Sequence, residues 1–253
     1  MTKISIVTAV YNRAKTIQET IDSVSSQQGC DYEYVVIDGN SNDGTGQIIA
    51  ENSSGIDISI RESDNGIYDA LNKGIQAATG DVVGFLHADD LFASSHVIQK
   101  VGEMLDSGEY DAIYGDLVYV DAADPCRVIR YWKSKPYRVQ KFRSGWMPPH
   151  PTVYIRKSVY EAFGMYRTDM GTGADYECMV RHMVVNKIRV GYVPEVMVKM
   201  RVGGASNVSL SSRIKANLGD RDAWISNGLT APLGIRWTKP LSKLFQYFRK
   251  PPS

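Results

Sequence analysis

Short apolar runs rich in β-branched residues alternate with helical patterns along the first 110 residues of the chain. The apolar runs predict four strands, at residues 4–10, 34–38, 56–61 and 82–86. The stretches between them predict three helices, at residues 12–28, 46–51 and 68–78, the first capped by Asn12. Alternation of this kind is typical of βαβ units, so we expect an α/β protein with a mostly parallel central sheet flanked by helices.

The pattern is less regular beyond residue 110. Strands are predicted at residues 112–121 and 128–132, and two short strands around Pro194 within residues 189–201. Helices are predicted at residues 175–186 and 211–227. Between these elements, residues 133–151 are rich in proline and basic side chains and are expected to form an irregular loop.

The last segment, residues 223–253, contains no acidic residue. Its basic residues surround apolar residues at helical spacings: Arg236, Lys239, Lys243, Arg249 and Lys250 around Leu241, Leu244, Phe245 and Phe248. This pattern predicts a basic amphipathic helix, a kind of segment that binds membrane surfaces. We therefore separate a tail, residues 223–253, from two larger parts, residues 1–110 and 111–222.

The composition is that of an ordinary globular protein, since 43% of the 253 residues are hydrophobic and 23% are charged. A net charge of only +1 gives no reason to expect nucleic acid as a partner. Cys30, Cys126 and Cys178 lie far apart in the sequence, which argues against a disulfide framework and a structural zinc site. The apolar run before Asn12 is too short for a signal peptide or a membrane span, so we expect a cytoplasmic protein.

Adjacent acids, Asp89 and Asp90, follow the predicted strand at residues 82–86 directly. Ligands of open α/β sheets bind at the carboxyl ends of the strands, and two carboxylates there suit a hard divalent cation that bridges to phosphates. The alternative is an N-cap, because aspartate is favoured at that position and a helix is expected from about Ser94.

Two further polar segments lie near strand ends. Asp38 opens a turn that runs to Thr45, where a carboxylate can accept hydrogen bonds from a base or a ribose; a plain strand-to-helix turn is the alternative. Residues 62–74 combine acids with Asn72 and Lys73, either as a polar wall beside a nucleotide or as a capped surface helix. The first strand is followed by no GxGxxG, and the chain has no GxxxxGK[ST], which argues against a dinucleotide-binding Rossmann enzyme and a P-loop protein.

Four segments together identify a family resemblance: TAVYN at residues 8–12, VVIDGNSNDGT at 35–45, SDNGIYDALNKGI at 63–75 and FLHADD at 85–90. Over residues 3 to about 205, the chain resembles family 2 glycosyltransferases, specifically bacterial ones that build surface polysaccharides. The resemblance implies a GT-A fold, a nucleoside-diphosphate sugar as donor, a Mn²⁺ or Mg²⁺ ion, and inversion at the anomeric carbon. It also implies that residues 1–110 bind the nucleotide sugar and that residues 111–222 bind the acceptor and carry the catalytic base.

The resemblance assigns roles by position to residues at the strand ends. Those expected to contact the nucleotide sugar are Thr8, Ala9 and Tyr11 in the base pocket, Asp38 at the base, Asp69 and Lys73 beside the nucleotide, and Ala88, Asp89 and Arg201 near the diphosphate. Asp89 and Asp90 are expected to hold the metal ion. His87 stands where many relatives have Asp or Asn, and it either reaches the ribose, ligates the metal or packs at the strand end.

An inverting transfer needs a base that takes the proton of the acceptor hydroxyl. Asp175, in the segment GTGADYE, matches the acidic motif that supplies this base in the family, and Glu177 is the second choice. The alternative for Asp175 is the N-cap of the following helix. His150 is either an acceptor-side residue or a structural histidine.

We therefore expect an inverting glycosyltransferase that transfers a sugar to a glycan acceptor, one that is lipid-linked, during O-antigen, capsule or exopolysaccharide assembly. It would work at the inner face of the cytoplasmic membrane as a peripheral protein. Two alternatives remain, a non-catalytic module that binds a nucleotide sugar or scaffolds a complex, and a nucleotidyltransferase. The first has no use for a base, and the second normally shows a glycine-rich basic loop after the first strand.

Overall fold

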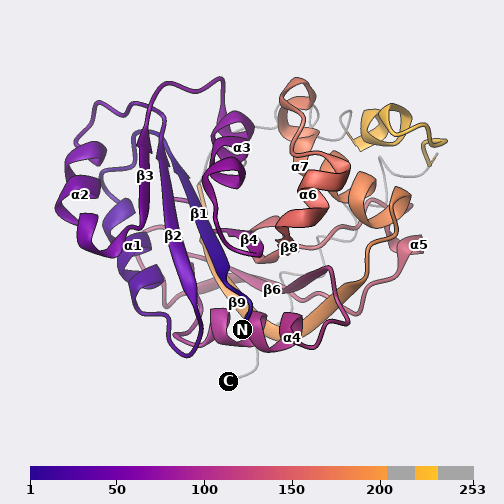
Figure 1. The fold of residues 1–253 in the computed structure, drawn as a ribbon, viewed down its shortest axis with the longest axis horizontal. Coiled ribbons are helices and arrows are strands. Elements are labelled where there is room, and N and C mark those ends of the chain that lie inside the picture. The colour runs from indigo at the N-terminus through magenta and orange to yellow at the C-terminus, as the bar shows by residue number, and fades with distance from the viewer. Residues whose placement is uncertain (204–219, 233–253) are drawn as a thin grey trace.

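A computed structural model describes residues 1–203 and 220–232 of the chain. Within them, one sheet of nine strands runs in the order β3-β2-β1-β4-β8-β6-β9-β5, with β7 paired to β6 (Figure 1). The strands are β1 (Ile4–Val10), β2 (Tyr32–Asp38), β3 (Ile58–Arg61), β4 (Val82–Phe85), β5 (Asp90–Phe92), β6 (Ala112–Val120), β7 (Val128–Trp132), β8 (Tyr154–Arg156) and β9 (Val190–Arg201).

Helices lie on both faces of this sheet. They are α1 (Ile17–Ser25), α2 (Thr45–Glu51), α3 (Ile67–Ala77), α4 (Val97–Asp106), α5 (Val139–Phe142), α6 (Lys157–Phe163) and α7 (Ala174–Met179), the last continued by a π-helical turn, Val180–Val185. Residues 220–226 are also helical. Of the predicted tail, residues 223–253, the structure describes only residues 223–232, so its basic stretch at 236–253 lies outside the described residues, as does most of the helix predicted at residues 211–227.

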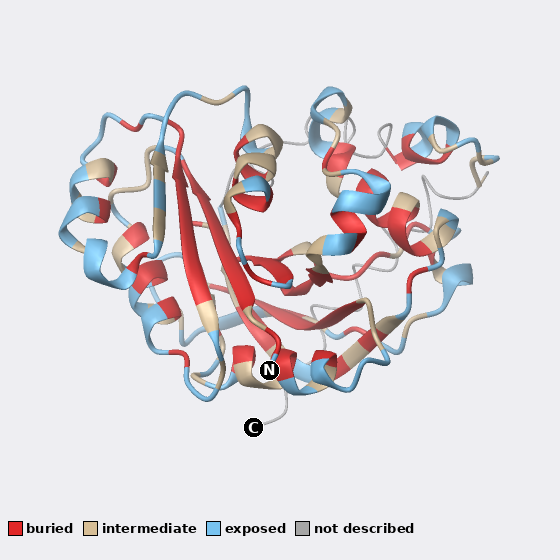
Figure 2. Cartoon of the chain, in the orientation of Figure 1, coloured by how far each residue is buried: buried red, intermediate tan, exposed pale blue. Residues whose placement is uncertain are grey.

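Two apolar cores sandwich the sheet. Side chains of α3 and α7, such as Leu71 and Met179, pack on one face, and those of α1 and α4, such as Ile21 and Ile98, pack on the other. Strands β1 and β2 are buried along almost their whole length (Figure 2). Burial on both faces explains why these strands appear in the sequence as continuous apolar runs.

The expected α/β class and the helices around a central sheet are confirmed. Strands β3, β2, β1 and β4 pair in parallel, as the βαβ pattern predicts. The second half adds antiparallel pairings of β8, β7 and β5, so the sheet as a whole is mixed. Because β1, β2 and β4 are parallel, their carboxyl ends lie at one edge.

Several boundaries differ from the prediction. Helix α1 begins at Ile17 with Thr16 as its N-cap, not at Asn12. Asn12 has a φ of 52° and its side-chain oxygen accepts the amide of Asn42, so it is bound to the turn after β2 instead. Residues 190–201 form one strand that passes Pro194 through register irregularities, instead of two short strands. The predicted loop at 133–151 contains α5, and β5, β8 and α6 were not anticipated.

Candidate active site

The residues after β1, β2 and β4 meet at the carboxyl edge of the parallel strands. In the register of the sheet, Val10 pairs with Asp38, and Val7 pairs with Phe85, the residue that begins FLHADD. At Gly39, an added Cβ would lie 2.3 Å from a carboxylate oxygen of Asp64 and 3.5 Å from the ring of Tyr11. Only glycine allows this approach, so the segments that follow β1, β2 and β3 are packed together at the edge. The Tyr11 side chain is 57% exposed and lies open to a ligand.

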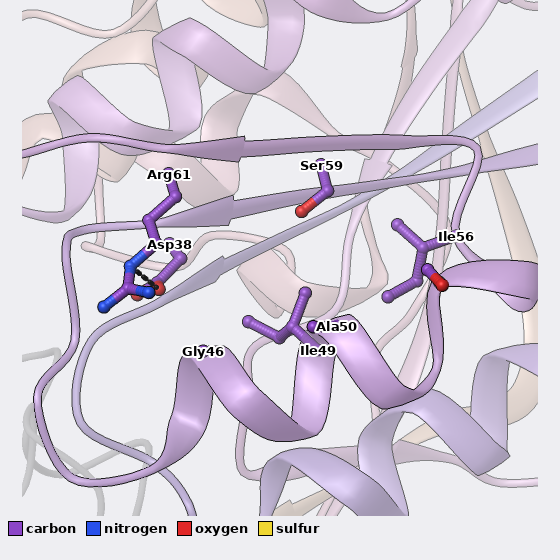
Figure 3. Close-up of a pocket in the computed structure, with 8 residues that line it drawn as sticks. Asp38, Gly46, Ile49, Ala50, Ile56, Ser59 and Arg61 are labelled. Atoms are coloured by element: carbon purple, nitrogen blue, oxygen red, sulfur yellow. Dashed lines mark ion pairs between the residues drawn. The ribbon is translucent and has the colours of Figure 1, made fainter.

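Asp38 is only 1% exposed, and its carboxylate is largely engaged by protein groups. Its Oδ1 accepts the backbone N–H (2.9 Å) and the hydroxyl (2.5 Å) of Ser41, while its Oδ2 lies 3.3 Å from Nε of Arg61. The two residues close one end of a pocket of about 240 Å³ between α2 and β3, whose walls include Ile49, Ala50, Ile56 and Ser59 (Figure 3). Asp38 therefore fixes the turn that follows β2.

Thr8 and Ala9 lie within β1 and are buried. The hydroxyl of Thr8 donates to the carbonyl of Leu86 at 2.7 Å and accepts the hydroxyl of Tyr34 at 3.0 Å. Thr8 thus ties β1 to the residue immediately before His87, and it affects the site through that contact.

Asp69 and Lys73 lie one turn apart on α3. Lys73 Nζ is 2.8 Å from a carboxylate oxygen of Glu62 and 3.7 Å from one of Asp69, and it donates to the carbonyl of Ser63 at 2.8 Å. Asp69 accepts the backbone N–H of Asn65 at 2.9 Å. Together these contacts fasten the acidic loop before α3 onto the helix.

Asp89 and Asp90 do not cap a helix. Helix α4 begins only at Val97, with His96 as its N-cap, and Asp90 is instead the first residue of β5. Asp89 is partly exposed, whereas Asp90 is completely buried, and neither carboxylate oxygen of Asp90 has a hydrogen-bond partner among the described residues. Burial, and next the charge of Asp89, raise the pKa of Asp90 well above its usual value, against the opposing effect of Arg201.

A buried carboxylate without a partner fits a cation, because a cation would offset the cost of its charge. Within residues 1–203 and 220–232, no group of three or more His, Cys, Asp or Glu side chains is gathered as a metal site. A metal at Asp89 and Asp90 would therefore need further oxygen ligands from water or from a substrate.

A row of rings connects His87 with the second half of the chain. The ring of His87 stacks on that of His150 at 5.7 Å, and His150 meets Tyr166 at 5.6 Å. The His150 Nε2 and the Tyr166 hydroxyl share a hydrogen bond of 2.8 Å. Tyr166 in turn lies 5.6 Å from the ring of Tyr68 on α3. Burial is the main cause that lowers the pKa of His150, to about 3, so His150 is a neutral part of this row.

His87 ends this row beside the two acids. Its Nδ1 is buried and has no hydrogen-bond partner among the described residues. Burial lowers the pKa of His87, although the nearby charge of Asp89 acts in the opposite direction. A neutral imidazole with an unpaired nitrogen can bind either a hydroxyl or a metal ion.

Asp175 lies at the other end of the row. Burial is the main cause of the raised pKa of Tyr68; the charge of Asp175 raises it further and a hydrogen bond with the Asp175 backbone lowers it, so the Tyr68 hydroxyl lies beside Asp175. Asp175 stands in the first turn of α7, whose N-cap is Gly173, and its carboxylate accepts the backbone N–H of Tyr176 at 2.7 Å. The N-cap alternative for Asp175 is therefore wrong, and its side chain remains partly exposed.

Glu177, the second choice for the base, is 1% exposed and fully engaged. Its carboxylate forms an ion pair with Arg181 at 3.0 Å and accepts the side-chain amide of Asn227 at 3.1 Å. Arg181 also donates to the carbonyls of Gly164 and Met165, both at 2.6 Å. Glu177 thus helps to hold the loop that carries Tyr166 and has no free oxygen turned to solvent.

Arg201 lies at the end of β9, close to the acidic residues. Its guanidinium pairs with Glu19 on α1 and donates to the backbone carbonyl of Asp89 at 3.2 Å. The structure therefore gathers Tyr11, His87, Asp89, Asp90 and Arg201 near one edge. Sequence reasoning did not single out Tyr68 or Tyr166, although Tyr68 lies within one of the four family segments.

The chain resembles known proteins in both sequence and structure. Residues 5–163 match the model of Glycosyl transferase family 2. The chain is 31% identical over 189 residues to an uncharacterized glycosyltransferase of Mycobacterium tuberculosis, covering 72% of this chain and 69% of that protein. Its fold matches S. aureus TarS in complex with UDP-GlcNAc, with a TM-score of 0.71 at 16% identity over 97% of this chain and 72% of that one. It also matches the mannosyltransferase PcManGT from Pyrobaculum calidifontis in complex with GDP-Man and Mn²⁺, with a TM-score of 0.65 at 18% identity over 93% of this chain and 68% of that one.

The mixed α/β sheet with its polar carboxyl edge is thus the GT-A fold of glycosyltransferases that use nucleotide sugars. The chain belongs to glycosyl transferase family 2. This membership confirms the family resemblance and decides against a nucleotidyltransferase. Among the described residues, no helix is both long enough and apolar enough to cross a membrane.

Proposed function

We propose that this glycosyltransferase is metal-dependent and inverting, and that it transfers a sugar from a nucleoside-diphosphate donor to a hydroxyl group of a glycan acceptor. The observation that carries the proposal is the pair Asp89 and Asp90 at the carboxyl edge, with the Asp90 carboxylate buried and unpartnered. The row of rings from His87 to Tyr68 connects this pair with Asp175. A cation site and a base on one connected surface are what such a transfer needs.

Asp89 and Asp90 would hold the metal ion, which supplies charge stabilisation for the departing diphosphate when bound. The PcManGT structure contains Mn²⁺ together with GDP-Man, which supports manganese here. Arg201 is buried beside Asp89, and its charge favours an anionic group at this edge.

The exposure of the other predicted donor-binding residues decides which of them can contact the donor directly. The open ring of Tyr11 offers a surface for the base, next to the turn that Asp38 fixes. Asp69 and Lys73 act through the loop 62–66, which they fasten so that its Asp64 lies beside Gly39. Thr8 and Ala9 shape the edge from within β1, and Ala88 does so from the turn between β4 and β5; all three residues are buried.

Asp175 is the proposed base. In an inverting transfer the acceptor oxygen attacks the anomeric carbon in one in-line displacement while its proton passes to the base. The bond to the diphosphate oxygen breaks as the new glycosidic bond forms. The partly exposed Asp175 carboxylate suits this role, whereas the carboxylate of Glu177 is already held by Arg181 and Asn227.

For the acceptor, we propose a lipid-linked oligosaccharide in O-antigen, capsule or exopolysaccharide assembly, reached by the enzyme as a peripheral protein at the inner face of the cytoplasmic membrane. The support is the sequence resemblance and the basic amphipathic pattern of residues 236–253. Residues 111–222 would form the acceptor side, with His150 and Tyr166 in its wall.

A donor screen tests the proposed function. Nucleotide release from a panel of UDP-, GDP- and dTDP-sugars is measured with Mn²⁺, with Mg²⁺ and with a chelator, because slow donor hydrolysis needs no acceptor. We expect release from one class of donor, dependent on the metal. Tight donor binding without release or transfer to any acceptor would favour the non-catalytic module.

A further inference from the structure

Helix α1 presents a polar face as well as an apolar one. Ile17, Ile21 and Val24 pack into the core, as their spacing predicts. Thr20 and Ser23 lie on a second face of α1, and the N-cap Thr16 and Gln27, which follows the helix, continue this face at spacings of four residues. This second face lies along β5 and the loop before it.

The polar face binds the backbone of the acidic segment at every second residue. Thr16 Oγ1 donates to the carbonyl of Ala88 at 2.8 Å, and Thr20 Oγ1 donates to the carbonyl of Asp90 at 3.0 Å. The backbone N–H of Phe92 donates to Ser23 Oγ at 2.7 Å. Farther along, the Gln27 side chain donates to the carbonyl of Ser94 at 2.8 Å.

Arg201 fills the gap in this series. Its guanidinium donates to the carbonyl of Asp89 at 3.2 Å and pairs with Glu19, which also belongs to α1. Three successive carbonyls, those of Ala88, Asp89 and Asp90, are therefore each bound by a side chain of α1 or by Arg201. On its other side, β5 pairs with β9, with Asp90 opposite Met200.

The backbone and the side chain of Asp90 therefore differ in their hydrogen bonding. A buried backbone carbonyl needs a partner, and α1 supplies it through the fully buried Thr20. The Asp90 carboxylate, in contrast, has no hydrogen-bond partner among the described residues. Holding the backbone while leaving the carboxylate unpaired keeps the ligand oxygens available in a fixed place, as a preorganised binding site requires.

We infer that Thr16, Thr20 and Ser23, together with the Glu19–Arg201 pair, are positioning residues that fix the Asp89–Asp90 segment for the cation and the donor diphosphate. The ligand part of this inference rests on the proposed function. The structural part, that these side chains order residues 88–92, does not, and it has a separate measurement.

Amide hydrogen exchange tests the structural part in the metal-free full-length protein. Thr20→Val keeps the shape and removes the hydroxyl, and Ser23→Ala removes the acceptor of the Phe92 amide. In each variant we expect exchange in residues 88–92 to be about fivefold to tenfold faster, the effect of one lost hydrogen bond, with exchange in β1 and β2 unchanged. Thr20→Ser, which keeps the hydroxyl, is expected to restore wild-type exchange.

A matched control lies at the opposite edge of the sheet. Thr2 is also buried, and its hydroxyl hydrogen-bonds the side chain of Asp106, far from the carboxyl edge. Thr2→Val removes a comparable hydroxyl, and we expect it to leave exchange in residues 88–92 unchanged. If residues 88–92 exchange equally fast in Thr20→Val, in Ser23→Ala and in the wild type, the inference is overturned.

Calorimetry with UDP or GDP in the presence of Mn²⁺ tests the ligand part. We expect Thr20→Val to weaken Mn²⁺-dependent binding about tenfold, while Thr20→Ser and Thr2→Val bind like the wild type. Faster exchange with unchanged binding would overturn the positioning role. If the wild type binds neither nucleotide, the proposed donor class fails, and hydrogen exchange still decides whether α1 orders the segment.

Discussion

Asp90 combines two properties that rarely occur together in a structural residue. It is completely buried, and its carboxylate has no hydrogen-bond partner among the described residues, so its charge is costly in the metal-free protein. Binding of a cation would remove that cost. The residue therefore links stability to ligand binding, and the two can be measured separately.

Asp90→Asn should stabilise the metal-free protein at neutral pH and abolish Mn²⁺-dependent nucleotide binding. The pKa of Asp90 is raised on folding, so the wild type loses stability as pH rises above the ordinary aspartate range, and the neutral variant does not. We expect a gain of about 1 kcal/mol or more at pH 7 that disappears at pH 3. Urea unfolding at both pH values measures the gain in stability, and calorimetry measures the loss of nucleotide binding. Equal stability of the variant and the wild type at pH 7 would contradict the prediction.

Asp89→Ala provides the comparison within the same pair. Asp89 is partly exposed, so its removal should cost Mn²⁺-dependent donor binding without a comparable gain in stability. Isothermal titration with the nucleotide and Mn²⁺ measures the loss. Wild-type affinity in this variant would remove Asp89 from the metal site.

Asp175 is expected to contribute to the transfer step and not to donor binding or stability. Asp175→Asn should keep donor affinity and thermal stability close to wild type, because asparagine can still accept the Tyr176 amide. The transfer rate should fall by about 10²- to 10⁴-fold, the usual contribution of a general base. Rates of donor hydrolysis or transfer, compared with melting temperatures, separate these effects; a variant that keeps most of its rate would exclude Asp175 as the base.

Among the elements, α7 has a structural role besides carrying Asp175. Glu177 and Arg181, one turn apart, form a buried pair, and Arg181 binds the carbonyls of Gly164 and Met165 just before Tyr166. The loop with Tyr166 is also fixed from α3, where Asn72 makes two hydrogen bonds with the Tyr166 backbone, of 2.8 and 2.9 Å. Helix α3 and the π-helical turn that continues α7 thus hold the same tyrosine from two sides.

Glu177→Ala should destabilise the protein strongly, by about 3 to 5 kcal/mol, because it leaves the Arg181 charge without its main partner. Chemical denaturation measures the loss. Asp169→Ala is the matched control, since Asp169 forms an exposed pair with Arg167 on the same side of the molecule, and it should change stability little. Similar effects of the two substitutions would contradict the role of Glu177.

For the whole molecule, the open prediction concerns the tail. Residues 236–253 carry five basic residues and no acid, so at an anionic membrane each basic residue would contribute about 1 kcal/mol of attraction. Deletion of these residues should move the protein from the membrane fraction to the supernatant. A variant in which the five basic residues are replaced by glutamine separates charge from the apolar stripe, and unchanged fractionation of both would exclude the tail as the anchor.

The sequence by itself determined the α/β class, the parallel first half and the place of the acidic motif. These follow from local signals, since strand periodicity, turn residues and the polar residues after each strand are all contiguous in the chain. Because parallel strands end at one edge, knowing that Asp38, His87 and Asp89 follow such strands was enough to expect them near each other. The family segments added the class of sugar donor, which the periodicity of apolar residues does not indicate.

Only the tertiary structure decided which side chains hold that edge in place. Thr20 and Asp90 are 70 residues apart, and Tyr166 and Asn72 are 94 apart, so no local pattern predicts their hydrogen bonds. For the same reason the sequence left β8 and β5 unassigned, since three-residue strands are defined by their partners and not by periodicity. Helix α1 illustrates the limit: its apolar spacing predicts the face that meets the core, whereas the role of its polar face depends on what packs against it.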